Sequence, residues 1–340
     1  MTALQFELPP ELAAAHPRAD RDRSRLLVAR PSGIDHAVFA ELEAFLRPGD
    51  LLVVNTSATL AAALDGRRAD GRALTVHFAT ALDDGRWIVE LRPAADATGP
   101  LPDIAAGERV RLPDGVTLTV LEPAAPGPGV TRLWLAEVGV EGGVEHYLAR
   151  HGRPIRYGYL DGDVPLANYQ TVFARDPGSA EMPSAGRPFT AELVAGLVAA
   201  GIALAPITLH TGVSSQEAGE PPMPERFTVP ATTARLVNST RAAGGRVVAV
   251  GTTVTRALES AAERSGRVRP AAGWTELVLG PNRPARVVGG LITGWHAPGA
   301  SHLQLLQAVA GTPLVAAAYE AALRERYLWH EFGDSCLLLP

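Results

Sequence analysis

The stretch Arg246-Val-Val-Ala-Val-Gly-Thr-Thr-Val-Thr-Arg-Ala-Leu-Glu259 decides the fold class of this chain. Its apolar run predicts a buried strand ending at Gly251, and the apolar spacing that follows predicts an amphipathic helix. The capped run from Thr190 and the apolar run after Gly201 repeat this alternation. Alternating helices and strands indicate an α/β fold. Helices are predicted near 190–200, 231–243, 253–264 and 300–325, and strands near 202–209, 246–250, 275–279 and 286–292.

Residues 66–140 have a different hydrophobic pattern, in which short segments of alternating apolar and polar residues are separated by Asp-Asp-Gly and Pro-Asp-Gly turns. Two such segments joined by a tight turn are typical of a β-hairpin. The predicted hairpins pair 73–78 with 87–91 and 110–112 with 116–121, and a further strand covers 131–138. Short strands this close together, with no helical period between them, indicate a small antiparallel β-barrel.

These two sequence patterns predict the domain organisation. We expect a mixed α/β protein whose discontinuous main domain comprises residues 1–62 and 151–340. A small antiparallel β-barrel domain is inserted between them at 63–150. In the first part of the main domain, the pattern predicts a helix at 36–46 and a buried strand at 51–54.

The composition excludes several classes of protein. Of the 340 residues, 46% are hydrophobic and 20% are charged, which excludes a disordered chain. A net charge of −5 argues against a generally basic nucleic-acid coat. None of the 31 basic residues is a lysine, so every cationic contact is a guanidinium fork suited to carboxylate or phosphate, and Schiff-base chemistry is excluded.

Cysteine usage and hydropathy predict a cytoplasmic protein with no membrane partner. Cys336 is the single cysteine and has no partner for an intrachain disulfide, which favours a reducing compartment. Residues 193–216 carry no Asp, Glu or Arg, but Gly201 and Pro206 divide this run into a helix and a strand rather than a membrane span. The first seven residues lack the pattern of a signal peptide.

Polar residues follow the predicted strands where ligands gather in α/β sheets. Thr252 and Thr253 follow Gly251 at a turn that would present backbone N–H groups to an anionic ligand, although either threonine would also serve as a helix cap. His210 and His296 follow two other strands, each as a ligand contact or as a hydrogen-bonded structural residue. The nine histidines show no metal-binding spacing, so no metal site is predicted.

Two arginine clusters stand out. The first is Arg18-Ala-Asp-Arg-Asp-Arg-Ser-Arg25, which is explained most simply as a solvated, internally paired loop. The second places Arg150, Arg153 and Arg156 beside Tyr157 and Tyr159. Guanidinium forks next to aromatic rings suit phosphates and stacked bases, so this cluster is either a nucleic-acid contact or an ordinary charged surface.

An ordered set of motifs adds a family resemblance. In sequence order they are Leu8-Pro-Pro-Glu-Leu12, Arg21-Asp-Arg-Ser-Arg-Leu-Leu-Val28, Leu46-Arg-Pro-Gly-Asp-Leu-Leu-Val-Val-Asn55, Asn168-Tyr-Gln-Thr-Val-Phe-Ala174, Thr208-Leu-His210, Gly245 to Glu259, Leu291-Ile-Thr293 and Gly333-Asp334. Together these motifs resemble the S-adenosylmethionine:tRNA ribosyltransferase-isomerase family of queuosine biosynthesis. The resemblance extends from about residue 8 to 338 and implies an α/β domain with a β-barrel beside it.

The resemblance implies an unusual reaction. The family transfers and isomerises the ribosyl part of S-adenosylmethionine onto 7-aminomethyl-7-deazaguanine in tRNA, forming epoxyqueuosine and releasing adenine and methionine. S-adenosylmethionine is then a substrate, tRNA is the acceptor, and no metal is required. The implied catalytic residues are His210, Glu225 and His296, and the implied substrate-binding residues are Arg21, Arg25, Asn55, Tyr169, Gln170, Thr171, Ser184, Gly186, Thr208, Gly251, Thr252, Thr253, Arg256 and Thr293.

Several stretches differ from the usual family pattern. Asn55-Thr-Ser-Ala-Thr-Leu-Ala-Ala-Ala-Leu64 stands where the family has Asn-Asp-Thr-Arg-Val-Ile-Pro-Ala-Arg-Leu, and Gly299 replaces a lysine. These differences leave two alternatives beside the family reaction. One is a paralogue that uses S-adenosylmethionine with a small-molecule acceptor, and the other is a non-catalytic binding paralogue.

Overall fold

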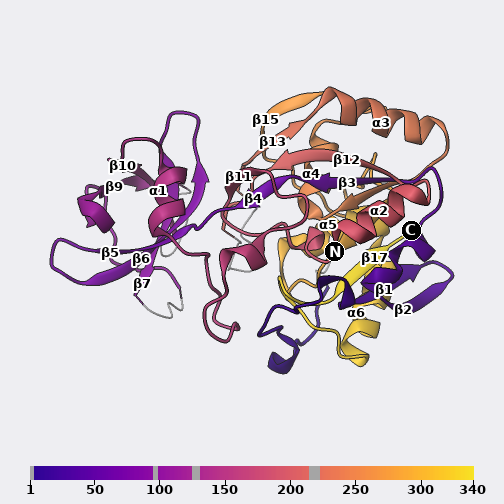
Figure 1. Cartoon of the computed structure of the whole chain (residues 1–340), viewed down its shortest axis with the longest axis horizontal. Helices are drawn as coiled ribbons and strands as arrows, with labels where there is room; N and C mark the ends of the chain where they lie inside the picture. The colour runs from indigo at the N-terminus through magenta and orange to yellow at the C-terminus, as the bar shows by residue number, and fades with distance from the viewer. Residues whose placement is uncertain (1–3, 95–98, 125–130, 214–222) are drawn as a thin grey trace.

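The computed structural model describes residues 4–94, 99–124, 131–213 and 223–340. Within these residues the strands form a nine-stranded mixed sheet, a closed antiparallel barrel and a two-stranded ribbon. Figure 1 shows the barrel on the left and the main sheet with its helices on the right. The mixed α/β class with a small antiparallel barrel is therefore confirmed.

The main sheet has the strand order β15-β13-β12-β3-β14-β16-β17-β1-β2. The strands are β1 (Arg25–Arg30), β2 (Gly33–Val38), β3 (Leu51–Asn55), β12 (Ala203–Leu209), β13 (Glu225–Val229), β14 (Val247–Val250), β15 (Ala271–Thr275), β16 (Gly290–Thr293) and β17 (Ser335–Leu338). The four strands β12, β3, β14 and β16 pair parallel to one another. Their carboxyl ends therefore meet at one edge of the sheet, the edge at which α/β proteins bind ligands.

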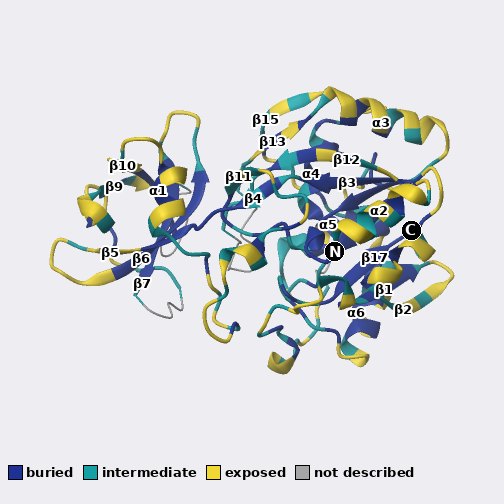
Figure 2. Cartoon of the chain, viewed as in Figure 1, coloured by how far each residue is buried: buried dark blue, intermediate teal, exposed yellow. Residues whose placement is uncertain are grey.

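Helices cover both faces of the main sheet. They are α2 (Ala191–Ala199), α3 (Ala231–Ala242), α4 (Thr252–Ser260), α5 (Ser301–Ala310) and α6 (Thr312–Arg324). Alternate residues of β3 point to opposite faces, so Leu51 and Val53 pack with α3 to α6, while Leu52 and Val54 pack with α2. Figure 2 shows buried strands between helices whose outer surfaces are exposed.

The barrel strands follow β3 in sequence and precede β12. They are β5 (Ala63–Arg67), β6 (Ala73–Ala81), β7 (Trp87–Pro93), β8 (Arg109–Arg111), β9 (Thr117–Pro123) and β10 (Leu133–Val138). The pairs β6–β7 and β8–β9 are the two predicted hairpins, and the pairing of β10 with β9 helps to close the barrel. Helix α1 (Val144–His151) packs on β5, and the ribbon of β4 (Ser57–Thr59) and β11 (Asp176–Ser179) lies between the barrel and the main sheet.

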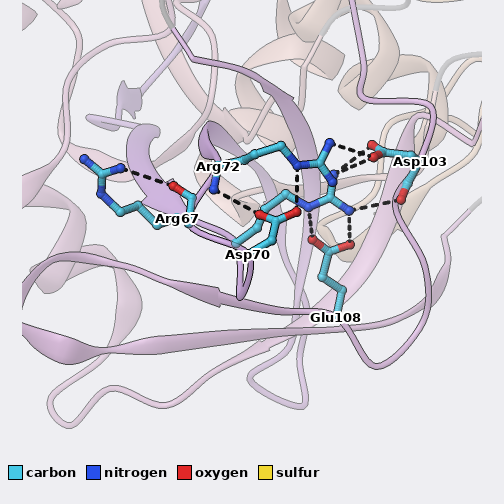
Figure 3. Close-up of polar contacts among 7 residues, drawn as sticks. Arg67, Asp70, Arg72, Asp103 and Glu108 are labelled. Atoms are coloured by element: carbon cyan, nitrogen blue, oxygen red, sulfur yellow. Dashed lines mark hydrogen bonds and ion pairs between the residues drawn. The ribbon is translucent and has the colours of Figure 1, made fainter.

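An ion-pair network fastens one end of the barrel (Figure 3). The Arg68 guanidinium, which is 10% exposed, lies 2.8 Å from the carboxylate of Asp103 and 2.5 Å from that of Glu108. Arg72 joins Asp103 to Asp70, at 3.1 Å and 2.7 Å. The network ties the β5–β6 turn to the segment before β8 across a gap of about 30 residues in sequence.

Three sequence predictions of local structure are wrong. The helix expected at 36–46 is strand β2 followed by a 3-10 helix, Phe39–Phe45, because the first residues pair with β1 and Phe39 and Leu42 are buried three residues apart. The strand expected at 275–279 is β15, which ends at Thr275. The helix expected at 300–325 is two helices, because the chain turns at Gly311 with φ 77°.

Candidate active site

A cavity of about 420 Å³ opens at the carboxyl ends of the parallel strands. It is bounded by the ends of β14 and β16, the first residues of α4, the β4–β11 ribbon, and two segments after α1 and α6. The residues that line it are Thr59, Ile155, Tyr157, Tyr159, Tyr169, Ala180, Glu181, Met182, Pro183, Ser184, Ala185, Thr211, Gly251, Thr252, Thr253, Thr293, Gly294, Trp295, His296, Ala297, Ala300, His302, His330 and Glu331. The lining combines aromatic faces with a small number of polar groups, as is typical of a small-molecule site.

One wall of the cavity is a column of three rings. The ring centroids of Tyr157 and Tyr159 lie 5.8 Å apart with 8° between the planes, and those of Tyr159 and His330 lie 4.2 Å apart with 14°. His330 has φ 72°, in the left-handed region that costs a non-glycine residue on the order of 1–3 kcal/mol. The surrounding fold therefore holds this ring parallel to Tyr159 against a local backbone preference.

A carboxylate lies beside this aromatic column. The Tyr159 hydroxyl donates a hydrogen bond to the Glu331 carboxylate. Burial raises the pKa of Glu331 above its usual value, and the hydrogen bond from Tyr159 acts in the opposite direction. A carboxylate with a raised pKa is a better proton acceptor near neutral pH than an ordinary glutamate.

Three histidines of the cavity are neutral at pH 7. Burial lowers the pKa of His296 well below its usual value, and the neighbouring His302 and His330 add to this shift. Burial also lowers the pKa of His302 to about 4 and that of His330 below its usual value. The rings of His296 and His302 stack at 4.6 Å, and the Thr293 hydroxyl lies 3.0 Å from Nε2 of His296. These rings offer hydrogen-bonding nitrogens without adding positive charge.

The first turn of α4 supplies a second kind of group. Gly251 adopts φ 102° and ψ 158°, a conformation that favours glycine, and this turn directs the chain from β14 into the helix. Thr252 and Thr253 then line the cavity with the unpaired N–H groups of a helix N-terminus, which attract partial or full negative charge. The structure places these residues at the cavity, and the predicted contact of this turn with a ligand stays a prediction.

Asn55 holds three elements together behind the cavity. Its amide nitrogen donates to the Leu209 carbonyl at 2.8 Å and to the Thr253 hydroxyl at 3.3 Å. Its oxygen accepts from the backbone N–H groups of Ser57 and Leu209 at 3.1 Å and 3.0 Å. Asn55 therefore fixes the ends of β3 and β12 relative to the first turn of α4.

His210 lies behind the cavity wall. Its Nδ1 is 2.7 Å from the Ser57 hydroxyl, which is 2.6 Å from the Ser179 hydroxyl. Burial lowers the pKa of His210, and the nearby Asp176 acts against that shift. The next residue, Thr211, lines the cavity. In the described part of the chain His210 therefore contacts the ribbon of β4 and β11 rather than the open space.

The motif Tyr169-Gln170-Thr171 is anchored next to the cavity. Tyr169 lines it, while the Gln170 amide exchanges hydrogen bonds with the backbone of Thr59 at 3.0 Å and 2.8 Å. Arg21 donates to the Gln170 carbonyl at 2.5 Å. The Thr171 hydroxyl accepts from a backbone N–H two residues on. Arg21, Gln170 and Thr171 thus position the wall that Tyr169 provides.

Glu225 and Arg256 form an ion pair, and neither is among the residues that line the cavity. Arg256 is nevertheless close enough to the lining residue His302 for its charge to add to burial in lowering the pKa of that imidazole. Burial raises the pKa of Glu225 to about 7, and the Arg256 charge opposes this shift. Arg256 also donates to the carbonyls of Thr275 and Leu277 at 3.3 Å and 3.2 Å. These contacts join α4 to β13 and the end of β15. The prediction that Glu225 is catalytic remains a prediction.

The remaining predicted residues have other neighbours. Arg25 donates to the Glu325 carbonyl at 2.7 Å and lies over the Tyr327 ring at 3.9 Å. The Thr208 hydroxyl is 2.8 Å from that of Thr56. Gly186 is buried and Ser184 lines the cavity. Among the predicted site residues, the structure gathers at the cavity Tyr169, Ser184, Gly251, Thr252, Thr253, Thr293 and His296.

His302, His330 and Glu331 line the cavity although the sequence motifs do not predict them as site residues. The sequence does single out Tyr157 and Tyr159, but as neighbours of the Arg150–Arg156 cluster, and the arginines of that cluster pair instead with Asp114, Asp65 and Asp163. His330 and Glu331 lie three and two positions before Gly333, at the start of the quoted Gly333-Asp334 motif. The polar pair His330-Glu331 beside that motif is the feature of the sequence that could have predicted these two site residues.

The described part of the chain contains no group of three or more His, Cys, Asp or Glu side chains arranged to hold a metal ion. Its helices likewise include none with the length and apolar character needed to cross a membrane.

The fold and the cavity define a class of protein: a mixed α/β chain with a β-barrel, in which the ends of the parallel strands border a cavity lined by aromatic and polar side chains. The model of the queuosine biosynthesis protein family matches residues 1–338. The chain therefore belongs to the queuosine biosynthesis protein family.

Individual relatives match over the full length. A protein of Symbiobacterium thermophilum named S-adenosylmethionine:tRNA ribosyltransferase-isomerase is 37% identical, with 100% of this chain and 99% of the relative covered. A protein of the same name from Rubrobacter xylanophilus is 41% identical, with 99% and 96% covered. The crystal structure of S-adenosylmethionine tRNA ribosyltransferase from Thermotoga maritima is similar to this structure, with a TM-score of 0.55, 29% sequence identity, and 98% and 99% of the two chains covered.

Proposed function

We propose that this chain is an S-adenosylmethionine:tRNA ribosyltransferase-isomerase. It transfers the ribosyl part of S-adenosylmethionine to 7-aminomethyl-7-deazaguanine in tRNA, forms epoxyqueuosine, and releases adenine and methionine. The observation that carries this proposal is the full-length match to relatives of that name, at 37% and 41% identity, on a chain with a strand-end cavity. The reaction takes place in the cytoplasm with S-adenosylmethionine as substrate, and needs no metal.

The cavity suits a sulfonium nucleoside. The flat faces of Tyr157, Tyr159 and Trp295 give a purine ring surfaces on which to stack, and Thr252 and Thr253 offer N–H groups to a ligand oxygen or ring nitrogen. The imidazoles of the cavity are neutral, so they do not repel the sulfonium cation. The negative charge of Glu331 attracts it.

Glu331 is also the residue best placed to act as the base. The sulfonium charge makes the neighbouring C5′–H bond acidic, and a carboxylate that accepts this proton leaves the electron pair on C5′, next to the positive sulfur. The raised pKa of Glu331 suits that step, and Tyr159 orients the carboxylate through its hydrogen bond. His296, held by Thr293, is a donor to the departing adenine.

The other predicted residues act around this centre. Asn55 and His210 hold the cavity wall, and Arg21, Gln170 and Thr171 hold the wall bearing Tyr169. We assign residues 1–62 and 151–340 to the catalytic domain and 63–150 to the barrel domain, in keeping with the closed barrel formed by β5 to β10.

The test is a single-turnover assay. The purified protein is incubated with S-adenosylmethionine and tRNA that carries 7-aminomethyl-7-deazaguanine, and adenine and methionine are measured by chromatography. The proposal expects equal amounts of both products and a tRNA gain matching the transferred ribosyl group. A control uses the same tRNA with unmodified guanine at that position, which offers no aminomethyl nucleophile.

Other outcomes would identify the alternatives. If calorimetry shows S-adenosylmethionine binding but the protein has no affinity for tRNA, the acceptor is a small molecule. If both bind and neither adenine nor methionine appears above the control, the chain is a binding paralogue. Either result overturns the proposed reaction.

A further inference from the structure

A second hollow lies along α3, on a different part of the molecule from the cavity. It is bounded by α3 and the segment 265–270, and its volume is about 720 Å³. Four of the residues that line it are arginines, and none is an aspartate or glutamate. In a chain with a net charge of −5, such a groove is a local concentration of positive charge. We call it the α3 groove; its polar lining residues are Arg235, Asn238, Ser239, Arg241, Ser265, Arg267 and Arg269.

The four arginines have different surroundings. Arg241 is held in place, because it donates to the carbonyls of Gly266 and Arg286. Arg269 pairs with Glu263 at 2.5 Å. Arg235 and Arg267 are exposed, and among the described residues their guanidinium groups make no direct hydrogen bond or ion pair. The charge of Arg267 does act at longer range on Glu263, whose pKa is lowered mainly by the hydrogen bond from Arg269 and further by Arg267. Two fork-shaped donors are thus free to bind an anion from solvent, and a third is already fixed at the groove wall.

Helix α4 links the α3 groove to the cavity. Its first residues, Thr252 and Thr253, line the cavity, and its chain continues past Ser260 to the groove residues 265–270. Helix α4 has nine residues and is about 13 Å long, and residues 261–264 separate its end from the groove segment. A nucleic-acid strand carries one phosphate per roughly 3.4 Å, so a strand whose modified base enters the cavity would need at least about four further nucleotides to cover the length of this helix.

We propose that the α3 groove binds the phosphodiester backbone of the substrate tRNA. The inference rests on the proposed function, because it assumes that a tRNA base occupies the cavity. Helix α3 has 12 residues and is about 18 Å long, which spans about five phosphates of one RNA strand. The occupant is anionic and extended, since the groove is open along the helix and lined by arginine forks rather than by aromatic rings.

The test replaces the two free arginines together, Arg235→Gln and Arg267→Gln. The matched control is Arg324→Gln with Arg326→Gln, which removes the same charge from side chains that are 62% exposed elsewhere on the surface. Binding of the aminomethyl-deazaguanine tRNA is measured by filter binding from 50 to 200 mM salt. The groove variant should bind at least about tenfold more weakly, and its log K against log salt slope should fall by about two.

A second readout separates the groove from the cavity. The KM for S-adenosylmethionine and the calorimetric Kd for S-adenosylmethionine should be unchanged in the groove variant, while the KM for tRNA rises. If the groove variant and the control bind tRNA alike, the groove proposal is overturned. If wild-type protein turns over its substrates in that case, the proposed function stands without it; if wild-type protein neither binds nor modifies tRNA, both fall.

Inorganic tripolyphosphate distinguishes a nucleic-acid backbone from a free polyphosphate. It offers the same phosphate chemistry but spans fewer arginines than an RNA strand. We expect it to compete with tRNA only at millimolar concentration. Micromolar binding of tripolyphosphate that is lost in the groove variant and does not displace tRNA would overturn the assignment.

Discussion

Replacing Glu259 tests whether hydrogen bonds to a buried carboxylate stabilise the segment that leads to the cavity. Glu259 lies near the end of α4, is 4% exposed, and accepts hydrogen bonds from three consecutive backbone N–H groups. The distances are 2.9 Å from Arg286, 2.8 Å from Val287 and 3.1 Å from Val288. This segment leads into β16, whose last residue is the Thr293 that holds His296. A buried carboxylate thus connects α4 to the strand that positions the cavity.

The perturbation is Glu259→Gln, which keeps the shape of the side chain and removes its charge. A hydrogen bond to a charged acceptor contributes about 1 kcal/mol more than one to a neutral acceptor. Three donors therefore lose about 3 kcal/mol together, and the new amide N–H₂ faces donors that it cannot satisfy. The free energy of unfolding should fall by about 3 kcal/mol.

Urea unfolding followed by circular dichroism measures this change, with Glu263→Gln as the control. Glu263 lies close by in sequence, but it is 41% exposed and pairs with Arg269 on the surface, where solvent screens the ion pair, so its replacement should change the free energy of unfolding far less than that of Glu259. If the two variants unfold within about 0.5 kcal/mol of each other, the three backbone contacts do not stabilise the fold as described.

Three further changes test the site and the fold. Glu331→Gln should lower kcat on the order of 100-fold or more, with little change in the Kd of S-adenosylmethionine. The kcat of the wild-type protein should rise with pH through the raised pKa of Glu331, and an unchanged kcat in the variant would exclude Glu331 as the base. Burial raises the pKa of Asp50, but hydrogen bonds from Arg246 lower it overall, so the stabilisation is present above pH 4 and is lost as pH falls through the lowered folded pKa. Asp50→Asn should therefore reduce the melting temperature at pH 7 and weaken its fall in acid, as calorimetry would show. Gly152→Ala would place a Cβ 2.0 Å from a backbone oxygen and should cost about 3 kcal/mol in urea unfolding, whereas Gly158→Ala meets nothing within 4 Å and should be close to neutral.

Local sequence patterns predicted those helices and strands whose conformation does not depend on which other elements pack against them. The apolar run before Gly251 is buried whichever strand pairs with it, and the turns before Trp87 and Thr117 specify hairpins by their own backbone preferences. The helix expected at 36–46 failed for the opposite reason. Its first residues complete an edge strand against β1, an interaction with a partner that the local pattern does not contain.

The class of fold, the family, and strand-end residues such as Gly251, Thr253 and His296 can be predicted from the chain alone, because each depends on local spacing or on an ordered set of motifs. Which of these residues share one cavity depends on the packing of elements that are far apart in the sequence. The tertiary structure places His210 behind the wall and Glu225 against Arg256, and brings Tyr159 and Glu331 together across 172 residues. Such contacts arise from how the sheet, the ribbon and the last helix pack. This packing cannot be predicted from the periodicity of hydrophobic residues along the chain.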